Sequence, residues 1–438
     1  MMKRISLILV AALLAPWAHA ASTAAKELVI VTSFPKELFE TYKKAFEARH
    51  PGVKVVINSK QTNAGVTYLR ETRARPDADI FWVSAPDAFQ TLKTDGLLEK
   101  YAPPQEITAR IPPKIGNFPI HDPDGTYFGF AVSGYGLMWN KNYLAAHKLP
   151  PSKEWTDLAS PRYFGHLVIS APSRSGTTHL TIEVILQAYG WDRGWALLLN
   201  SGGNMGAITE RSFGVPEAVI SGQYGIGVVI DFFGLSAIAS GHPVDFAYPS
   251  LTSIVPASVG IVKGAPNMEN AKTFVNYLLS EPGQMVLFSP QIGRLPVVPE
   301  LYSKGPKNYP NPFAMKMGGV DFNNRLSSGR RDVVNSLYDH IITFRHRELR
   351  EAWGSIYKAE AAAKGKDPGQ AKGLLAEARR LASQVPINDK RASDKEVAGA
   401  FKSKSGLKSQ LETEWENSAR GNYAKAKELA EKALALAR

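Results

Sequence analysis

The chain of 438 residues contains no cysteine. Disulfides, thiolate metal sites and cysteine nucleophiles are therefore excluded, and the folded state depends on its core alone. After the first residues, no apolar run approaches the ~20 residues that a membrane-spanning helix needs. The sequence also lacks H-E-x-x-H, the P-loop and G-x-S-x-G. Without these motifs the sequence shows no recognisable nucleophile–base pair or catalytic metal site, and we do not expect an enzyme.

The first twenty residues have the order of an export signal. Met-Met-Lys-Arg is followed by the apolar run Ile5–Ala15 and then by Ala18-His-Ala20. A basic start, a short apolar stretch and an A-x-A site are typical of a secretory signal peptide. We expect residues 1–20 to be removed and the mature chain to work outside the cytoplasm.

The net charge of +12 is strongly basic, and it remains +10 without Lys3 and Arg4 of the signal. An exported chain is not expected to meet nucleic acid, so this charge favours small anionic ligands or an anionic envelope surface. The alternative is that a pI near 9.5 serves solubility only.

Short apolar runs alternate with helical patterns from Glu27 to Pro299. Strands are expected at 28–31, 53–57, 78–83, 128–139, 167–169 and 225–230, with helices at 35–49, 63–74 and 267–279. Strand–helix–strand–helix–strand order predicts an α/β fold with a parallel sheet and right-handed crossovers. Ligands in such sheets bind at the carboxyl ends of the strands.

Small polar residues follow the first three expected strands. Ser33, Thr62, Asn63 and Ser84 stand at these carboxyl ends and offer neutral hydrogen bonds to a ligand. The alternative for each is an ordinary turn residue.

The stretch Ser170-Ala-Pro-Ser-Arg-Ser-Gly-Thr-Thr178 joins an apolar strand to a helix expected to start at about Thr178. Such a turn brings together free backbone N–H groups, hydroxyls and the positive end of a helix dipole, which attract anions. The candidate residues are Arg174, Ser175, Gly176, Thr177 and Thr178. The alternative is that Ser and Thr only cap the helix.

Two charged residues extend this candidate site. Arg211 lies in a loop beside a helix start and suits a second anion clamp; the alternative is a surface arginine paired with Glu210 or Glu217. Asp231 ends a strand and would accept hydrogen bonds from ligand hydroxyls or pair an ammonium; the alternative is a helix N-cap.

Metal-ligand signals are weak. His179 and Glu183 stand at i and i+4, and His121 precedes Asp122, but two ligands do not close a metal site. We expect these residues to lie on helix surfaces, and we predict no metal and no cofactor.

From about Arg325 the chain loses glycine and gains Lys, Arg, Glu and Ala. Amphipathic helices are expected at 332–353, 371–384 and 424–436. Residues 325–438 are thus predicted to form a helical extension packed on the back of the main domain; the alternative is a module that docks a partner.

The signal peptide, the opening Leu28–Phe34 and the segment Gly260–Ser280 together resemble the bacterial extracellular solute-binding proteins of family 1. The resemblance covers about Glu27 to Tyr302, and within this clan it is nearest to phosphoglycerate-transport regulatory proteins. The clan also includes ferric-ion, sugar-phosphate and phosphonate binders.

This resemblance implies a two-lobed fold with a hinge and a ligand cleft. Lobe 1 would comprise 27–130 and 233–305, and lobe 2 would comprise 131–232. The implied protein is a periplasmic monomer that captures a small anionic metabolite. Hinge closure then makes it recognisable to an inner-membrane ABC permease, or alternatively to a membrane sensor kinase.

In the resembled clan a Ser-Gly-small-residue turn holds phosphate, and Ser175-Gly176-Thr177 matches it. Its ferric binders carry two adjacent tyrosines where this chain has Asp231-Phe232-Phe233. Phenylalanine has no oxygen for Fe(III), a hard cation, so an organic anion is favoured and ferric iron is the alternative.

Overall fold

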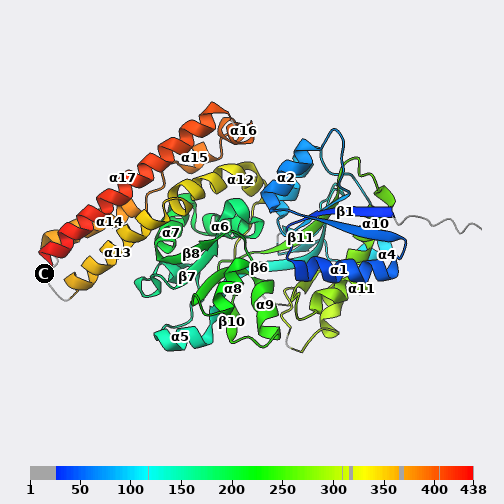
Figure 1. The fold of residues 1–438 in the computed structure, drawn as a ribbon, viewed down its shortest axis with the longest axis horizontal. Coiled ribbons are helices and arrows are strands. Elements are labelled where there is room, and N and C mark those ends of the chain that lie inside the picture. The colour runs from blue at the N-terminus through cyan, green and yellow to red at the C-terminus, as the bar shows by residue number, and fades with distance from the viewer. Residues whose placement is uncertain are drawn as a thin grey trace, which may run out of the picture.

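One long strand, β6 (Phe128–Asn140), runs through both lobes of the molecule (Figure 1). All of its residues are buried because strands pair along both of its edges. Its first half pairs antiparallel with β11 (Ile254–Ile261), and its second half pairs with β9 (Ile226–Ile230) and β10 (Val244–Ala247). A Cβ at Gly134, near the middle, would lie 2.6 Å from the Ile254 side chain, so this crossing point requires glycine.

The computed structural model describes residues 26–116, 118–307, 309–314, 319–364, 369–403 and 405–437. The expected signal peptide, residues 1–20, lies outside the described residues. No helix in the described ranges is both long and apolar enough to cross a membrane.

Lobe 1 is built on the parallel strands β1 (Lys26–Thr32), β2 (Val53–Ser59) and β3 (Ile80–Val83), in the order β2-β1-β3-β11. Helices α1 (Lys36–Arg49), α2 (Thr62–Glu71), α3 (Pro86–Thr94) and α10 (Met268–Leu279) belong to the same lobe. Leu38, Tyr42 and Phe46 of α1 recur every four residues and are buried, which explains why this segment is an amphipathic helix. The predicted parallel α/β unit is confirmed.

Lobe 2 places β7 (Leu167–Ser170) between β8 (Met205–Thr209) and β9, all parallel. Its helices are α6 (Gly176–Tyr189), α7 (Trp191–Asn204), α8 (Gly214–Ile220) and α9 (Asp231–Ala239). After β9, strand β10 pairs with the end of β6. The chain then enters β11, which pairs with β3 and with the first half of β6.

Short elements complete the two lobes. They are α4 (Gln105–Thr108), β4 (Lys114–Ile115), β5 (Phe118–Pro119), α5 (Lys141–His147), α11 (Glu281–Met285) and β12 (Leu295–Pro296).

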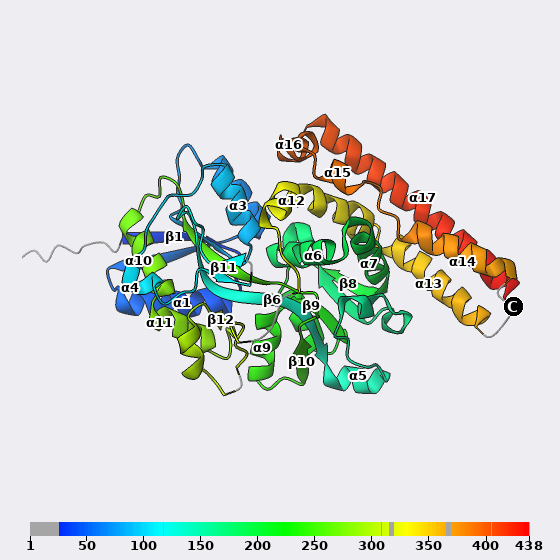
Figure 2. The ribbon, with the colours of Figure 1, turned by 180° about the vertical axis from the view of Figure 1, so that it is seen from behind.

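The extension begins with α12 (Asn324–Tyr338), a π-helical turn (Asp339–Thr343) and α13 (His346–Ala363). The single helix expected at 332–353 is therefore two helices. Then follow α14 (Gly369–Ala382), α15 (Asp389–Ala392), α16 (Lys395–Ser403) and α17 (Gly406–Leu436). Figures 1 and 2 show α13, α14 and α17 side by side, away from lobe 1.

The extension is packed into lobe 2 through a pair of glycines on α7. A Cβ at Gly203 would lie 2.2 Å from the ring of Trp353 on α13, and one at Gly202 would lie 3.1 Å from Ile342. Because these glycines let α13 approach the α7 backbone so closely, Trp353 is 1% exposed. The extension is thus continuous with the core of lobe 2, as the packed-appendage prediction requires.

Candidate functional site

Both lobes contribute to a polar cavity of about 20 Å³. A cavity of this size holds about one water molecule. The residues that line it are Ser33, Phe34, Pro35, Gln61, Thr62, Ser84, Arg174, Ser175, Gly176, Thr177, Arg211, Ser212, Phe232, Phe233 and Arg294.

Eight of the eleven candidate residues from the sequence line this cavity. They are Ser33, Thr62, Ser84, Arg174, Ser175, Gly176, Thr177 and Arg211. Asn63, Thr178 and Asp231 lie outside the lining, so the fold brings most but not all of the candidates together.

The turn before α6 both caps the helix and leaves donors free. Ser175 is the N-cap, and its Oγ accepts the Thr178 N–H at 3.1 Å. The Thr178 hydroxyl contacts Ser170 and Ser175, which ties the turn to the end of β7. The N–H groups of Gly176 and Thr177 have no acceptor in the described part of the chain. Capping and anion attraction are therefore compatible at this turn.

The two lobes meet at this turn. A Cβ at Gly176 would lie 2.8 Å from Thr62 Oγ1 and 2.9 Å from the Ala85 Cβ, both in lobe 1. Asn63 of α2 donates to the Ser173 carbonyl of lobe 2 at 2.9 Å. The structure is therefore the closed arrangement of the lobes.

Two lining arginines belong to lobe 2, Arg174 at the end of a short 3-10 helix and Arg211 in a loop. Arg174 forms an ion pair with Glu210, and both side chains are substantially exposed. Arg211 stacks over Phe213 at 5.0 Å, and partial burial lowers its pKa. The expected alternative partner of Arg211, Glu210, pairs with Arg174 instead. Arg211 forms no ion pair within the described ranges.

Arg294 is a lining residue that the sequence analysis missed. It is fully buried, and its guanidinium lies 4.6 Å from the ring centre of Phe34 in lobe 1 and 3.7 Å from that of Phe232 in lobe 2. Nη1 donates to Ser84 Oγ at 3.1 Å, whereas Nε and Nη2 have no partner among the described residues. Burial lowers the pKa of Arg294 to about 9, so it is charged at neutral pH.

A signal for Arg294 was present in the sequence. It is the only charged residue of the apolar run Ile292–Val298. An arginine in such a run must be buried, and a buried charge requires a partner or a ligand.

Asp231 differs from its N-cap alternative and is not among the residues that line the cavity. It is the first residue of α9 rather than its N-cap, and it is buried behind the cavity. Its Oδ2 accepts the Gly134 N–H at 2.7 Å and the Tyr248 hydroxyl at 2.9 Å. Burial raises the pKa of Asp231 to about 6, and these hydrogen bonds oppose that rise. The carboxyl group therefore fixes α9 to the crossing point of β6.

His179 and Glu183 correct a further expectation. Both are fully buried rather than on a helix surface, because α12 covers this face of α6. Glu183 forms two hydrogen bonds with Arg330, and His179 contacts Asp87, Ser327 and Asn335. The described residues contain no group of three metal-ligating side chains.

Two α/β lobes joined by a crossing strand, with a polar cavity between them, define the class of two-lobed solute-binding proteins. The comparison with family models agrees: the model described as bacterial extracellular solute-binding protein matches residues 76–323. The chain belongs to this family.

Among curated relatives, the phosphoglycerate transport regulatory protein PgtC of Salmonella typhimurium is 30% identical over 391 residues, which cover 89% of this chain and 93% of PgtC. Of solved structures, the periplasmic binding protein AfuA from Actinobacillus pleuropneumoniae, with fructose-6-phosphate bound, has a TM-score of 0.65 at 22% identity. Iron-bound HitA from Pseudomonas aeruginosa has a TM-score of 0.57 at 19% identity. At these identities the structures establish the shared fold.

The solved structures and PgtC differ in how much of the helical extension their matches include. The AfuA match covers 99% of AfuA but 73% of this chain, and the HitA match covers 97% of HitA but 69% of this chain. The 391 residues aligned with PgtC exceed the 324 that precede Arg325, so that alignment reaches at least 67 residues into the extension. Similarity to PgtC therefore includes the helical extension.

Proposed function

We propose that this protein captures a small organic anion, a phosphorylated or phosphonate metabolite, between its lobes in the periplasm. The closed form is then recognised by a membrane partner of an ABC importer. The observation that carries the proposal is Arg294: a buried guanidinium in the cavity wall, with two nitrogen atoms that lack hydrogen-bond partners among the described residues.

The physical argument is charge compensation. Burying a guanidinium that makes a single hydrogen bond costs free energy; the charge of the buried Asp231 offsets this cost only in part, and an anion in the cleft offsets the remainder. The free N–H groups of Gly176 and Thr177 line the same cavity, so one anion reaches both the arginine and the positive end of α6. Arg174 and Arg211 complete the anion site, while Ser33, Thr62 and Ser84 contact the rest of the ligand.

Asn63, Thr178 and Asp231 act from outside the cavity in this proposal. Thr178 holds the turn against β7, Asp231 holds α9 against β6, and Asn63 bridges α2 to the Ser173 carbonyl. Each fixes a segment whose neighbouring residues line the cleft.

The lining favours an anion over a metal cation. It contains three arginines, and none of its described residues is Asp, Glu, His or Tyr. Fe(III) prefers anionic oxygen ligands, whereas Phe232 and Phe233 offer none. The names of two relatives support a phosphate ester in particular, since one refers to phosphoglycerate transport and the other to bound fructose-6-phosphate.

Thermal unfolding with candidate ligands tests the proposal. The panel contains 3-phosphoglycerate, fructose-6-phosphate, a phosphonate, glucose and ferric citrate. A ligand at about one hundred times its Kd stabilises the folded state by about 2.7 kcal/mol. A response to ferric citrate alone, or to glucose alone, contradicts the proposal.

Arg294→Met provides a sharper test, with Arg162→Met at an exposed site as the matched control. Because Arg294 forms no ion pair with a carboxylate among the described residues and bonds only to Ser84, Arg294→Met is expected to leave the ligand-free protein folded while abolishing the response to phosphate esters. Arg162→Met is expected to change neither. An unchanged ligand response in Arg294→Met refutes the assigned role.

A second function, signalling to a membrane sensor, is favoured by the PgtC alignment that continues into the extension. Uptake and induction measured in parallel in cells separate the two functions. Loss of induction with unchanged uptake, on changing the extension, supports signalling; loss of uptake alone supports transport.

A further inference from the structure

Helix α12 of the extension reaches both lobes beside the cleft. Both views place it above α6, with α2 beside it in Figure 1 and α3 beside it in Figure 2. Successive residues of a helix point about 100° apart, so two neighbouring side chains face different directions. Arg330 and Arg331 are such neighbours, and each is bound by a different lobe.

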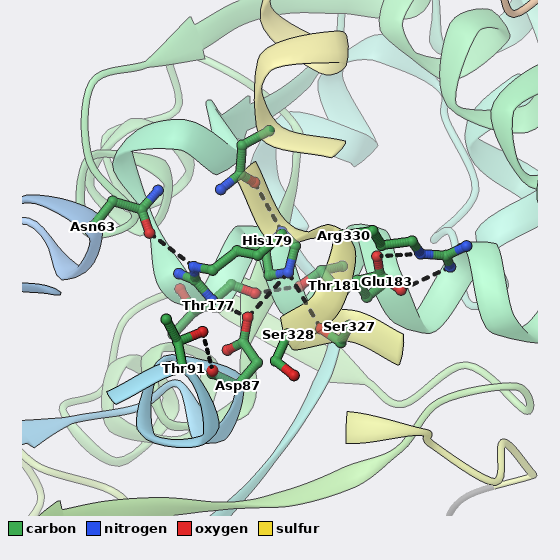
Figure 3. Close-up of polar contacts among 12 residues, drawn as sticks. Asn63, Asp87, Thr91, Thr177, His179, Thr181, Glu183, Ser327, Ser328 and Arg330 are labelled. Atoms are coloured by element: carbon green, nitrogen blue, oxygen red, sulfur yellow. Dashed lines mark hydrogen bonds and ion pairs between the residues drawn. The ribbon is translucent and has the colours of Figure 1, made fainter. Parts of the chain in front are cut away.

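Arg330 attaches α12 to lobe 2. Its Nε and Nη2 donate to the two carboxylate oxygens of Glu183 on α6, each at 2.9 Å (Figure 3). Glu183 is fully buried; burial raises its pKa, but the charge and hydrogen bonds of Arg330 outweigh this and leave the pKa below its ordinary value. Arg330 also pairs with Asp389 at 2.6 Å and lies over Trp191. This buried, bidentate pair is a firm anchor.

Arg331 attaches the same helix to lobe 1. Its Nε donates to Asn63 Oδ1 at 2.9 Å, and its Nη1 pairs with Asp87 of α3. Both partners are close in sequence to lining residues, since Asn63 follows Thr62 and Asp87 comes three residues after Ser84. Arg331 is 4% exposed and Asp87 is fully buried.

Asp87 is also the place where lobe 1 meets α6. The His179 Nε2 lies 3.0 Å from Asp87 Oδ2, and the His179 Nδ1 lies 2.8 Å from Asn335 Oδ1 of α12 (Figure 3). One carboxylate of lobe 1 is therefore shared by lobe 2 and the extension. Opening the cleft must separate Asp87 from His179, and with α12 anchored on lobe 2 it must separate Asp87 from Arg331 as well.

We propose that Arg331 is a positioning residue for ligand binding, which latches lobe 1 to the extension only when the cleft is closed. This inference rests on the proposed function, and it assigns to the extension the role of sensing closure. Closure by a ligand and docking of α12 on lobe 1 are then one equilibrium, so each favours the other. A partner that binds α12 or its surroundings reads the state of the cleft without touching the ligand.

The first experiment measures closure without any ligand. Because the chain has no cysteine, Glu40→Cys on α1 and Asn142→Cys on α5, both exposed, carry spin labels at defined positions in the full-length protein. The distance distribution is compared between Arg331→Met and Arg325→Met, the same substitution at an exposed site of α12. The latch predicts a smaller closed population for Arg331→Met, with the closed distance taken from this structure.

The second experiment adds 3-phosphoglycerate. Arg331→Met is expected to bind it roughly tenfold more weakly than Arg325→Met, within the 5- to 150-fold range of typical couplings. In the parent protein, hydrogen exchange of the α12 amides is expected to slow when 3-phosphoglycerate binds. Arg331→Lys, which keeps a charge for Asp87 but not the Nε contact with Asn63, is expected to fall between the two and replaces Arg331→Met if that variant does not fold.

The outcomes separate the two proposals. If 3-phosphoglycerate binds and closes the lobes but α12 exchange is unchanged, the latch is refuted and the proposed function stands. If no phosphate ester binds, the proposed function fails and the ligand-free distances alone decide on the latch. The latch is refuted if the spin-label distance distributions of Arg331→Met and Arg325→Met are identical without ligand.

Discussion

Asp231→Asn tests how the crossing point between the lobes is held together. The carboxyl group of Asp231 is fully buried, and its pKa of about 6 exceeds the ordinary value of 3.8 because burial disfavours the charged form. A difference of about two pKa units corresponds to roughly 3 kcal/mol. For an acid whose pKa is raised by folding, the favourable contribution is complete below the unfolded pKa and is lost as the pH rises through the folded pKa.

The stability of the parent protein is therefore expected to lose up to about 3 kcal/mol from this group between about pH 4 and pH 7. In Asp231→Asn the amide oxygen still accepts from the Gly134 N–H and the Tyr248 hydroxyl, and no charge is buried. The variant is expected to match the parent near pH 4 and to be more stable at pH 7.

Denaturant unfolding of both proteins at each pH from 4 to 8 measures this difference. Asp321→Asn, at an exposed position, is the matched control and is expected to follow the parent at every pH. A stability difference between Asp231→Asn and the parent that does not change with pH, or a variant that is less stable at pH 7, refutes the reasoning.

Three further substitutions probe the packing and the cleft. Gly203→Ala places a Cβ 2.2 Å from Trp353 and is expected to destabilise the protein by about 1–3 kcal/mol in denaturant unfolding, whereas Gly421→Ala, with open space, is not. Gly176→Ala places a Cβ 2.8 Å from Thr62 Oγ1; it is expected to hinder closure and weaken phosphate-ester binding in calorimetry, and unchanged affinity contradicts this. Arg174→Met removes a partly exposed ion pair, so a stability loss above about 1 kcal/mol contradicts its surface character.

Local patterns were sufficient for the elements that form the cleft. The apolar runs and helical spacing near the N-terminus predicted β1 to β3 because those segments pack within one parallel unit. The small-residue turn before α6 was legible because capping and dipole effects depend on neighbours in the chain. Eight residues of the cavity lining followed from this reading.

Contacts between distant segments explain what the sequence analysis missed. Glu183 pairs with a residue 147 positions later, so nothing near α6 indicated that its face would be covered. Asp231 accepts the N–H of Gly134, 97 positions earlier, a contact that only the tertiary structure shows. The short strand β10 pairs with β6 over four residues, too few for a clear alternation to indicate it.

The three buried arginines Arg330, Arg331 and Arg294 have different roles. Arg330 has both oxygens of Glu183 and Arg331 has Asp87, so each of these charges is balanced within the protein. Among the described residues Arg294 bonds only to the neutral hydroxyl of Ser84, although it is buried as deeply, and the charge of Asp231 acts on it without a hydrogen bond. Removing Arg330 or Arg331 leaves a buried carboxylate without its counter-charge, so we expect a loss of stability. Removing Arg294 breaks no hydrogen bond or ion pair with a carboxylate. We therefore expect the substitution to weaken ligand binding more than stability.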